Sequence, residues 1–435
     1  IIAIYVTVGG LKGVMYTDAL QGSVMFIGMM ILLGYTYMKV GGVVGGHEYL
    51  TGMADLVPGK LQAIGHAGWT AMPVFGFGEL KHSLWWIVVS TITLGVGIGV
   101  LAQPQLVVRF MTVKSKRELN RAVLIGGIFI MVMTGVAFTV GSLSNAFFAQ
   151  HGKAFAGRVV KVISEEKGHA VLQLMKKSES GDWTDIIKPD GSAAAAPVVL
   201  SEGEIGKATV EGKAVSVVEG RSISIVYAKG NPDQIIPTFI TSAMPKWFGL
   251  LFLLTLLAAA MSTLSSQFHA LGTSIGRDVY EQVTGAHGKG ISVTRIGIIV
   301  GIIMAVIISH YARGGYIIAR ATAIFFGLCA SAFLPAFVGG LFFRKMTRKG
   351  AIASMVVGFV VTAFWLLFVK AKEAGAIGLV HLFTEKDSIL AGHHNWPVVD
   401  PIVIALPLSI IAAIVVSMLT KASGEEHLKK CFEGS

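Results

Sequence analysis

Long apolar segments constrain the fold of this chain more than any other feature of its sequence. Eight of them are long enough to cross the hydrocarbon core of a bilayer, which takes about 20 mostly apolar residues in a helix. Inside a bilayer the backbone has to pair its own N–H and C=O groups, so a single spanning segment of this kind folds as a helix. The sequence therefore predicts an all-α polytopic membrane protein, with a partial span at Ile1–Val8, a turn at Gly9–Gly13, and complete spans at Tyr16–Met38, Ser83–Val108, Ala122–Phe148, Trp247–Gly272, Ser292–His310, Ile317–Phe343, Ala351–Val369 and Pro401–Thr420.

Composition and charge agree with a membrane protein. Hydrophobic residues make up 53% of the chain and charged residues 14%, at a mean hydropathy of +0.69, which soluble globular domains rarely reach. The net charge of +11 could suggest a nucleic-acid partner, but the basic residues cluster in short loops between spans, as the positive-inside rule expects. We therefore expect the lipid bilayer as a partner and no nucleic acid.

Two basic loops set the expected topology. One runs from Arg109 to Arg121 and the other covers residues 344–349, with four predicted spans between them. An even number of spans places both loops on one side, which is the cytoplasm. The C-terminal tail then also lies in the cytoplasm, and the protein is a multi-pass protein of the cell membrane. No charged leader opens the chain, so we expect Ile1–Gly9 to be the end of a helix that begins upstream.

Residues 152–229 are not membrane-like. Apolar and polar residues alternate in short runs such as Gly157–Ile163 and Lys213–Gly220, and turn residues separate the runs. This pattern predicts a small β-rich extracytoplasmic insertion. The expected organisation is therefore spans in 1–151, the insertion in 152–229, further spans in 230–345, and two additional spans with a cytoplasmic tail in 346–435.

The stretch Leu256–Tyr280 has small residues and hydroxyls in the middle of a span. Several hydroxyls place oxygens at membrane depth, where an unpaired hydroxyl is costly; they belong to Ser262, Thr263, Ser265 and Ser266. Thr263 lies one turn after Ala259, so its hydroxyl and the Ala259 carbonyl can face the same point. Converging neutral oxygens suit a small hard cation. The alternative is that small residues let a neighbouring helix approach while the hydroxyls bond back to carbonyls one turn earlier.

The span Ser83–Val108 is interrupted by helix-weakening residues. Gly95, Gly97 and Gly99 stand at every second position, and Pro104 follows them. Such residues free backbone groups at membrane depth, which is tolerated where they line a cavity. A cavity for a transported solute is one explanation. A kinked helix with glycines at a packing contact is the other.

Asp18 stands at the mouth of the first complete span, shortly before Gln21. An acidic residue at this position attracts or gates cations in many membrane proteins. It can equally be an ordinary acidic residue that interacts favourably with the positive end of the helix dipole.

Three stretches, in the same order along the chain, closely resemble signatures of the sodium:solute symporter family, whose members include proline-, acetate- and pantothenate-type transporters. They are GGLKGVMYTDALQG at 9–22, LAQPQLVVRFM at 101–111, and AAAMSTLSS at 258–266 followed by the GRDVY exit. The resemblance covers nearly all of the chain except 152–229. It implies a LeuT-like five-plus-five inverted-repeat core whose first repeat is largely missing from an N-terminally incomplete sequence. It also implies that sodium moving down its gradient drives uptake of a small organic solute.

The resemblance implies roles for individual residues as well. Sodium, the coupling ion, would be bound by the Ala259 carbonyl and the hydroxyls of Ser262 and Thr263. Asp18 and Arg109 would lie on the cation path or act as gates. Proline-type members usually carry aromatic residues before the Gln-Pro pair, and their absence here favours a monocarboxylate or a compact amino acid. The substrate-binding residues would be Gly97, Gly99, Val100, Gln103 and Pro104.

Two other classes of function stay open. Related membrane domains sense a solute and signal through a partner, although little chain follows Thr420 here. An intramembrane serine hydrolase could use Ser265 and His269, which are one helical turn apart, but the sequence identifies no oxyanion hole or orienting acid. We therefore predict that the protein is not an enzyme and has no catalytic residue. His393 and His394 adjoin without further ligands, so no metal site beyond sodium is predicted.

Overall fold

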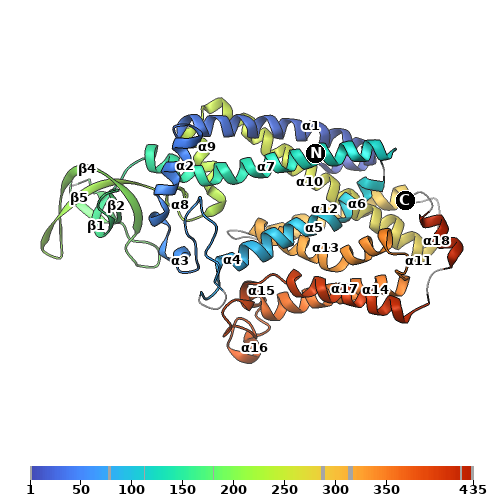
Figure 1. Ribbon diagram of the computed structural model, residues 1–435. Helices are drawn as coiled ribbons and strands as arrows, with labels where there is room; N and C mark the ends of the chain where they lie inside the picture. Colours follow the sequence, from blue (N-terminus) through green and yellow to red (C-terminus); the bar gives the residue numbers. More distant parts are fainter. Residues whose placement is uncertain are drawn as a thin grey trace. The chain divides into compact units, whose positions relative to one another are not determined.

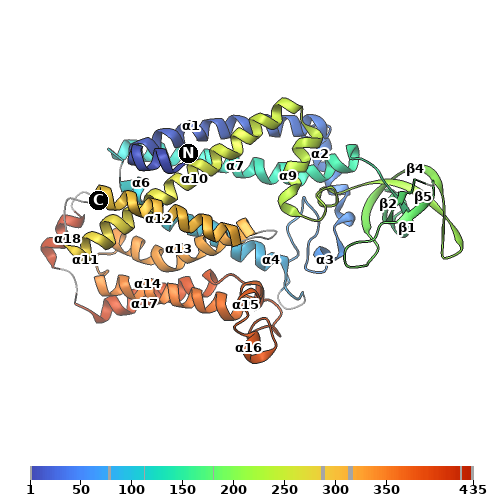
Figure 2. The same cartoon turned by 180° about the vertical axis from the view of Figure 1, so that it is seen from behind.

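A computed structural model describes residues 2–76, 80–111, 113–179, 181–285, 290–311, 317–421 and 424–432. The chain divides into two compact units, each of which is described by itself. Unit 1 comprises Ile1–Gly59, Ala67–Met72 and Arg117–Gly315, and unit 2 comprises Lys60–His66, Pro73–Lys116 and Tyr316–Ser435. Figures 1 and 2 show the elements of both units from opposite sides.

Eight helices among the described residues are long and apolar enough to cross a membrane, which confirms the predicted number of complete spans. A chain with this many such helices is a multi-pass membrane protein. The eight helices cover Gly13–Lys39, Leu84–Ala102, Lys116–His151, Lys246–Thr284, Ser292–His310, Arg320–Phe342, Arg348–Val369 and Ile402–Leu419.

Unit 1 is built on long helices with shorter ones between them. The long helices are α1 (Ile2–Lys39), α7 (Lys116–His151), α10 (Lys246–Thr273) and α12 (Gly290–Tyr311). The helix α10 continues as the π-helix η5 (Ser274–Glu281) and then as α11 (Gln282–Thr284). The shorter helices are α2 (Gly42–Gly52), η1 (Ala54–Leu56), α8 (Ser224–Tyr227), η4 (Pro232–Gln234) and α9 (Ile235–Ala243).

The helix α1 runs without a break through Gly9–Gly13, where the sequence suggested a turn between a partial span and the first complete one. That expectation was wrong. Each glycine costs a helix about 1 kcal/mol relative to alanine. In an apolar segment, however, a turn would leave backbone groups without partners, which costs more than the glycines do.

Glycine allows α1 and α10 to pack closely side by side, as both views show (Figures 1 and 2). Gly28 of α1 lies against the Thr255 side chain, so a Cβ at position 28 would meet the Thr255 hydroxyl. Further along the pair, Val14 is 1% exposed and packs with Phe268 of α10 and Ile298 of α12. These contacts fix the register of α1 on α10.

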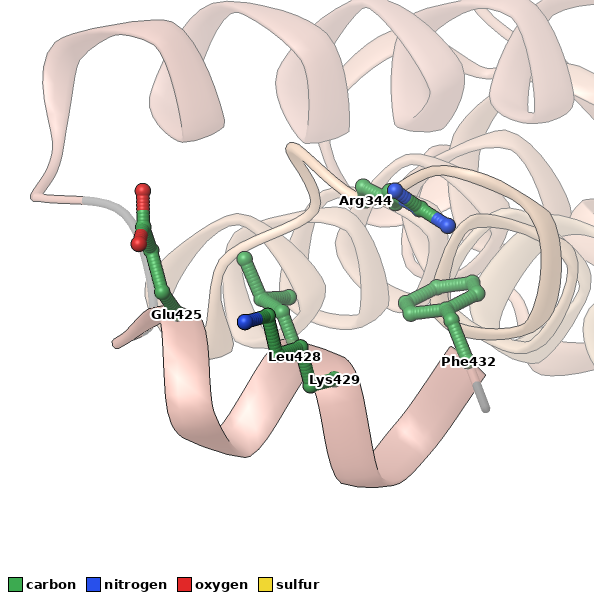
Figure 3. Close-up of a pocket in the computed structure, with 5 residues that line it drawn as sticks. All are labelled: Arg344, Glu425, Leu428, Lys429 and Phe432. Atoms are coloured by element: carbon green, nitrogen blue, oxygen red, sulfur yellow. The ribbon is translucent and has the colours of Figure 1, made fainter.

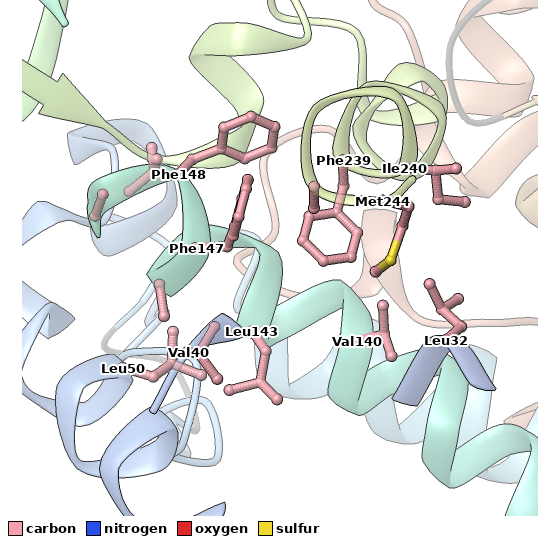
Figure 4. Close-up of a cluster of buried hydrophobic side chains, with 14 of the residues drawn as sticks. Leu32, Val40, Leu50, Val140, Leu143, Phe147, Phe148, Phe239, Ile240 and Met244 are labelled. Carbon is pink, nitrogen blue, oxygen red and sulfur yellow. The ribbon is translucent and has the colours of Figure 1, made fainter. Parts of the chain in front are cut away.

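The largest buried cluster of unit 1 joins residues of α1, α2, α7, α9 and α10, and Figure 4 shows part of it. Aromatic rings dominate its centre: Phe147 and Phe239 meet edge to face with ring centroids 5.2 Å apart. Between membrane helices, such large apolar side chains stabilise the contact mainly through close van der Waals packing. Other members include Leu32, Val40, Leu50, Val140, Leu143, Phe148, Ile240 and Met244.

Strands occupy the part of unit 1 between α7 and α8. They are β1 (Phe155–Ser164), β2 (His169–Lys177), β3 (Trp183–Asp185), β4 (Ala195–Val210) and β5 (Lys213–Ser222). The strand order is β1-β5-β4-β2-β3 with antiparallel neighbours, and an additional β1–β2 pairing closes four of the strands into a ring. Leu172, Leu174, Ala196 and Val198 form a buried cluster of their own.

Polar side-chain contacts connect this sheet to the segment that follows α2. Nδ1 of His169 lies 2.8 Å from Oδ1 of Asp55, and the His169 side chain is only 6% exposed. Lys167 adds a contact of 3.7 Å to Oδ2 of Asp55 and donates to the Gly52 carbonyl. The sheet is therefore held to η1 and to the end of α2 by charged groups.

Unit 2 contains a broken span and three long helices. The broken span consists of α4 (Leu84–Trp86), η2 (Ile87–Val96), α5 (Gly97–Gly99) and η3 (Val100–Ala102), and α6 (Pro104–Met111) follows it. The long helices are α13 (Ile317–Phe342), α14 (Arg348–Phe364), which continues as η6 (Trp365–Val369), and α17 (Ile402–Leu419). The remaining helices are α3 (Gly59–Gln62), α15 (Ala371–Ile377), α16 (His381–Thr384), η7 (Trp396–Val398) and α18 (Glu425–Phe432).

Small residues bring α13, α14 and α17 together. The Ser409 hydroxyl of α17 donates to the Ser354 carbonyl of α14 at 3.0 Å. Gly350 lies against Ser417, and Gly358 lies against the Ser331 carbonyl of α13, with no room for a Cβ at either glycine. Close backbone approach at small residues is typical of helix packing in membranes. Figures 1 and 2 show α14 and α17 side by side.

Candidate functional site

The predicted sodium residues lie on neighbouring turns of α10 in unit 1. The Thr263 hydroxyl donates to the Ala259 carbonyl at 3.0 Å, so these two oxygens lie together. Thr263 is exposed and Ser262 is half-buried. The same bond is what the packing alternative expects, since a hydroxyl in a helix commonly bonds back one turn. Two neutral oxygens can form part of a cation's ligand shell.

The structure brings Asp18 to two serines of the same helix. Its carboxylate accepts from the Ser265 hydroxyl at Oδ1 and from the Ser266 hydroxyl at Oδ2, each at 3.2 Å. Both hydroxyls also lie within hydrogen-bond distance of the Ser262 carbonyl, at 2.9 Å and 3.1 Å. Ser265 is fully buried and Asp18 half-buried. These groups place a carboxylate, two hydroxyls and a carbonyl around one region between α1 and α10.

Packing around the cluster sets its geometry. Val14, one turn before Asp18 in α1, is buried against Phe268, which lies one turn after Ser265 in α10. Residues four apart occupy the same face of a helix, so the apolar contact and the polar cluster are stacked along one interface. Oxygen ligands of this kind suit a hard cation such as sodium. We call Asp18, Ser265 and Ser266 the aspartate cluster.

The sequence placed Asp18 on a cation path but did not identify its partners. Ser265 was considered as one of several hydroxyls at membrane depth and, with His269, as a nucleophile with a base. The Ser265 hydroxyl instead lies beside the Asp18 carboxylate and the Ser262 carbonyl. The serine hydroxyls next to the predicted sodium residues were the signal in the sequence that pointed to such partners. Asp18 and Ser265, however, are 247 residues apart, and spacing along one helix cannot show that they meet.

The broken span of unit 2 has lost regular α-helical geometry. It passes from a π-helix over Ile87–Val96 through one turn of α-helix to a 3₁₀ turn over Val100–Ala102. Gln103 then has an extended backbone (φ −69°, ψ 127°), and Pro104 begins α6. The weakening predicted from Gly95, Gly97, Gly99 and Pro104 is therefore present, and the backbone leaves the helix at Gln103.

Two glutamines at the break have unused hydrogen-bonding atoms. The side-chain amide of Gln105 donates to Oε1 of Gln103 at 2.5 Å, and these residues are 9% and 3% exposed. Among the described residues, neither Nε2 of Gln103 nor Oε1 of Gln105 has a partner. Because buried polar groups nearly always have partners in native proteins, the pair is suited to a polar ligand. The sequence identified Gln103 and missed Gln105.

The other predicted substrate residues have different surroundings. Gly97 is exposed, and a Cβ there would meet nothing within 4 Å. Gly99 is buried against the Phe326 carbonyl of α13, which leaves no room for a Cβ, so it makes the close packing contact of the alternative explanation. Val100 is half-buried and Pro104 exposed. Arg109, predicted as a gate, lies half-buried in α6 of unit 2.

A separate pocket of about 350 Å³ lies in unit 2, beside the basic loop 344–349 (Figure 3). The Arg344 guanidinium stands over the Phe432 ring at 5.5 Å, and Glu425, Leu428 and Lys429 of α18 complete the lining. These residues are not among those predicted to bind sodium or solute. Within the described part of the chain, no three His, Cys, Asp or Glu residues are grouped so that they could hold a metal ion.

Comparison with known proteins identifies relatives along almost the whole chain. The osmoregulated proline transporter OpuE of Bacillus subtilis is 23% identical over 426 residues, which are 97% of this chain and 62% of that protein. The sodium/pantothenate symporter of Haemophilus influenzae is 24% identical over 361 residues, 82% of this chain and 54% of that protein. The chain thus spans little more than half the length of these curated relatives. Sodium/myo-inositol cotransporter 2 of Bos taurus is 50% identical over 54 residues, 12% of this chain and 8% of that protein.

The sequence model of the family described as "Sodium:solute symporter family" matches residues 1–180 and 209–358. The match continues into 152–180 and resumes before 229, so the expectation that the family resemblance excludes all of 152–229 was too broad. The unmatched segment inside this region is 181–208. Together the matched residues are well over half of the sequence. The chain belongs to the sodium:solute symporter family.

Proposed function

We propose that the protein is a secondary active transporter that couples sodium movement to uptake of a small organic solute across the cell membrane. The aspartate cluster carries this proposal, because it gathers hard oxygen ligands beside the signature helix of a symporter family. Relatives described as proline and pantothenate transporters support the same function. The alternative, a solute sensor that signals through a partner, has no support from these relatives, and none of them suggests an enzyme.

The sodium ion, as coupling ion, would bind at the Ala259 carbonyl and the hydroxyls of Ser262 and Thr263. The aspartate cluster begins only two residues later on α10, and we assign it to the path of ion release. Its negative charge attracts a cation, and its serine hydroxyls offer ligands while the ion moves. Arg109, in unit 2, is proposed as a gate at the cytoplasmic end of its span.

The solute would bind at the break in unit 2. Gln103 and Gln105 supply an amide donor and a carbonyl acceptor without other partners among the described residues, and these fit a carboxylate and an amine or hydroxyl of the solute. Gly97 leaves open space, while Val100 and Pro104 add apolar surface. Gly99 would act through its contact with α13. We propose a monocarboxylate or a compact amino-acid-like compound.

The proposed architecture follows the family resemblance. The core is a LeuT-like five-plus-five inverted repeat, of which this chain holds the end of the first repeat and the second repeat. Residues 1–151 and 230–345 supply core spans, 346–435 adds two spans and a tail, and 152–229 is a β-rich insertion. The basic loops support a location of the insertion outside the cell and of the C-terminus in the cytoplasm.

Uptake into proteoliposomes tests this function. The intact protein is reconstituted and offered labelled acetate, lactate, pyruvate, proline or pantothenate, with and without an inward sodium gradient. We expect sodium-dependent uptake of at least one compound and its loss in the double variant Ser262→Ala/Thr263→Ala. The same panel reports the class of solute, because the uptake of each labelled compound is measured separately.

A matched control keeps the test specific to the α10 site. Thr134 in α7 also has an exposed hydroxyl that donates one turn back, to the Ile130 carbonyl at 2.7 Å. Thr134→Ala should therefore leave sodium-driven uptake within about twofold of the original protein, since such exposed substitutions are usually mild. If no compound in the panel is taken up in response to sodium, the proposed function is wrong for these solutes. Sodium-dependent solute binding without flux would instead identify a sensor.

A further inference from the structure

A buried carboxylate stands beside the broken span of unit 2. Asp400, which precedes α17, is 0% exposed. Its Oδ2 accepts from Nζ of Lys370 at 2.9 Å, and its Oδ1 accepts from the Ile402 amide at 3.3 Å, in the first turn of α17. A carboxylate taken out of water is costly unless each oxygen has a partner, and here both have one.

The backbone of Asp400 is bonded directly to the broken span. Its amide donates to the Ser90 hydroxyl at 3.0 Å, and that hydroxyl donates to the Trp86 carbonyl at 2.5 Å. Ser90 lies in η2 and is fully buried. The π-helical part of the span, where regular i→i−4 bonds are absent, therefore gains a fixed hydrogen bond from a distant loop.

Gly327 makes room for the Asp400 side chain, and Gly95 lies beside it. A Cβ on Gly327 of α13 would lie 2.9 Å from its Oδ1, and a Cβ on Gly95 of η2 would lie 3.9 Å from the same oxygen. The first distance is too short for an ordinary contact, so the carboxylate occupies space that only glycine leaves. Asp400 thus contacts α13 and the broken span at once.

The loop that carries Asp400, residues 370–400, also holds the segment just before the span. The His82 amide donates to the His394 carbonyl at 2.7 Å, and the Ser83 amide donates to Oδ1 of Asn395 at 3.1 Å. Together with the Asp400–Ser90 bond, these contacts attach the start of the broken span to one loop at three places. The loop itself is attached to α13 by Glu373, which pairs with Arg320 at 3.0 Å.

We propose that Asp400, held in place by Lys370, is a positioning residue that fixes η2 and thereby the geometry of the break at Gln103. A span that has lost its regular hydrogen bonds takes its shape from tertiary contacts, and Asp400 supplies a buried, charge-supported one. The consequence for solute binding rests on the proposed function. The positioning of the span does not.

A reporter inside the span tests the positioning without any transport measurement. Gly97→Cys is introduced into the intact protein with Cys329 and Cys431 replaced by Ala, because a Cβ at position 97 meets nothing within 4 Å. Its rate of reaction with a small water-soluble maleimide is measured in nanodiscs. We expect Asp400→Asn to change this rate roughly tenfold, because it removes the charge that Lys370 holds in place and so loosens the backbone that binds Ser90.

Two further variants separate positioning from general loss of structure. Ser90→Ala removes the bond to the Asp400 amide and leaves the ion pair with Lys370, and it should change the labelling rate in the same direction. Glu373→Gln is the matched control, because it breaks the other ion pair of the loop without touching Asp400. Its rate should stay within about twofold of the parent. An unchanged rate in both Asp400→Asn and Ser90→Ala, or an equal change in Glu373→Gln, would overturn the proposal.

Uptake kinetics then test the consequence for the solute. In proteoliposomes, Asp400→Asn should raise the KM for solute about tenfold while the sodium concentration for half-maximal uptake stays the same, because the proposed sodium residues lie on α10 in unit 1. A changed sodium dependence with an unchanged KM would contradict the assignment to the solute. If the parent protein takes up no solute, the proposed function fails, and the labelling comparison still decides whether Asp400 positions the span.

Discussion

Gly28 of α1 lies against the Thr255 side chain of α10 so closely that position 28 cannot carry a Cβ without displacing the Thr255 hydroxyl. The Thr255 hydroxyl is itself held by the Leu251 carbonyl at 3.0 Å, and Thr255 is 2% exposed, so it has little freedom to move. The distance between the two helices at this level is therefore set by a glycine. The same helix pair carries Asp18 and Ser265 further along.

The first prediction concerns this helix contact. Gly28→Val should separate α1 from α10 and destabilise the protein by about 1–3 kcal/mol, as inserting atoms into a packed interface usually does. Gly34→Val in the same helix is the control, because a Cβ at Gly34 meets nothing within 4 Å. The thermal midpoint of the purified protein measures both. Equal midpoints for the two variants would mean that the contact at Gly28 does not set the helix distance.

The second prediction concerns the aspartate cluster. Asp18→Asn keeps the shape of the side chain but removes the charge that accepts from Ser265 and Ser266, and charged hydrogen bonds of this kind contribute about 1.5–3 kcal/mol. We expect the sodium concentration for half-maximal uptake to rise about tenfold or more. Ser23→Ala, on the exposed side of α1, is the control and should leave it unchanged. An unchanged sodium dependence of uptake in Asp18→Asn would show that Asp18 does not lie on the ion path.

The third prediction concerns the glutamine pair at the break. Gln103→Leu removes the buried amide whose nitrogen has no partner among the described residues. Loss of a hydrogen bond to the solute should raise its KM about tenfold without changing sodium affinity. Gln150→Leu, in α7, controls for loss of a half-buried glutamine elsewhere. An unaltered KM in Gln103→Leu would show that the solute binds without this amide.

The fourth prediction concerns pH and His82, which lies just before the broken span. Burial, and then the neighbouring charge of Lys81, lower the pKa of His82 below its ordinary value of 6.5. The unfolded chain therefore binds a proton first as pH falls, so this contribution to stability is complete above pH 6.5 and decreases below it. The thermal midpoint of the protein should therefore decrease as the pH is lowered from 7.5 to roughly 5.5.

The substitution His82→Asn checks the origin of that effect. Asparagine tolerates the positive φ of 58° at position 82 and does not titrate, so part of the pH dependence should disappear. His393, which is exposed, provides the comparison His393→Asn, and this variant should keep the pH dependence of the parent. If both variants behave alike, His82 is not the group responsible.

Much of the fold could be predicted from hydrophobic length and helix-breaking residues. The apolar runs gave the eight complete spans, and Gly95 to Pro104 gave the loss of regular helix in unit 2, because both depend on local chemistry. The turn predicted at Gly9–Gly13 was wrong for a related reason. Glycine weakens a helix locally, but an apolar surrounding favours continuous backbone pairing.

The partners of the site residues could not be predicted in the same way. Asp18 was singled out by its charge, yet its contacts with Ser265 and Ser266 depend on how α1 packs on α10. The unpartnered atoms of Gln103 and Gln105 depend likewise on which side chains surround the break. A sequence pattern identifies a residue type at a depth or on a helix face, whereas tertiary packing decides which groups meet.

The closed ring of strands has a consequence for crowding in the membrane. Strands β1, β2, β4 and β5 each pair with at least two other strands, but β1 meets β5 only at Phe155–Gly157 and β4 meets β2 only at Ala195–Val199. The β4–β5 pairing reaches further, to Val210 and Lys213, so the outer edges of this hairpin have no paired neighbour among the described strands. An open edge is a template on which identical chains join and aggregate. The strand β3, with three residues, also lies at the rim of the sheet. Where copies of the protein crowd together, the outer edges of the β4–β5 hairpin are therefore where a strand of another copy would add.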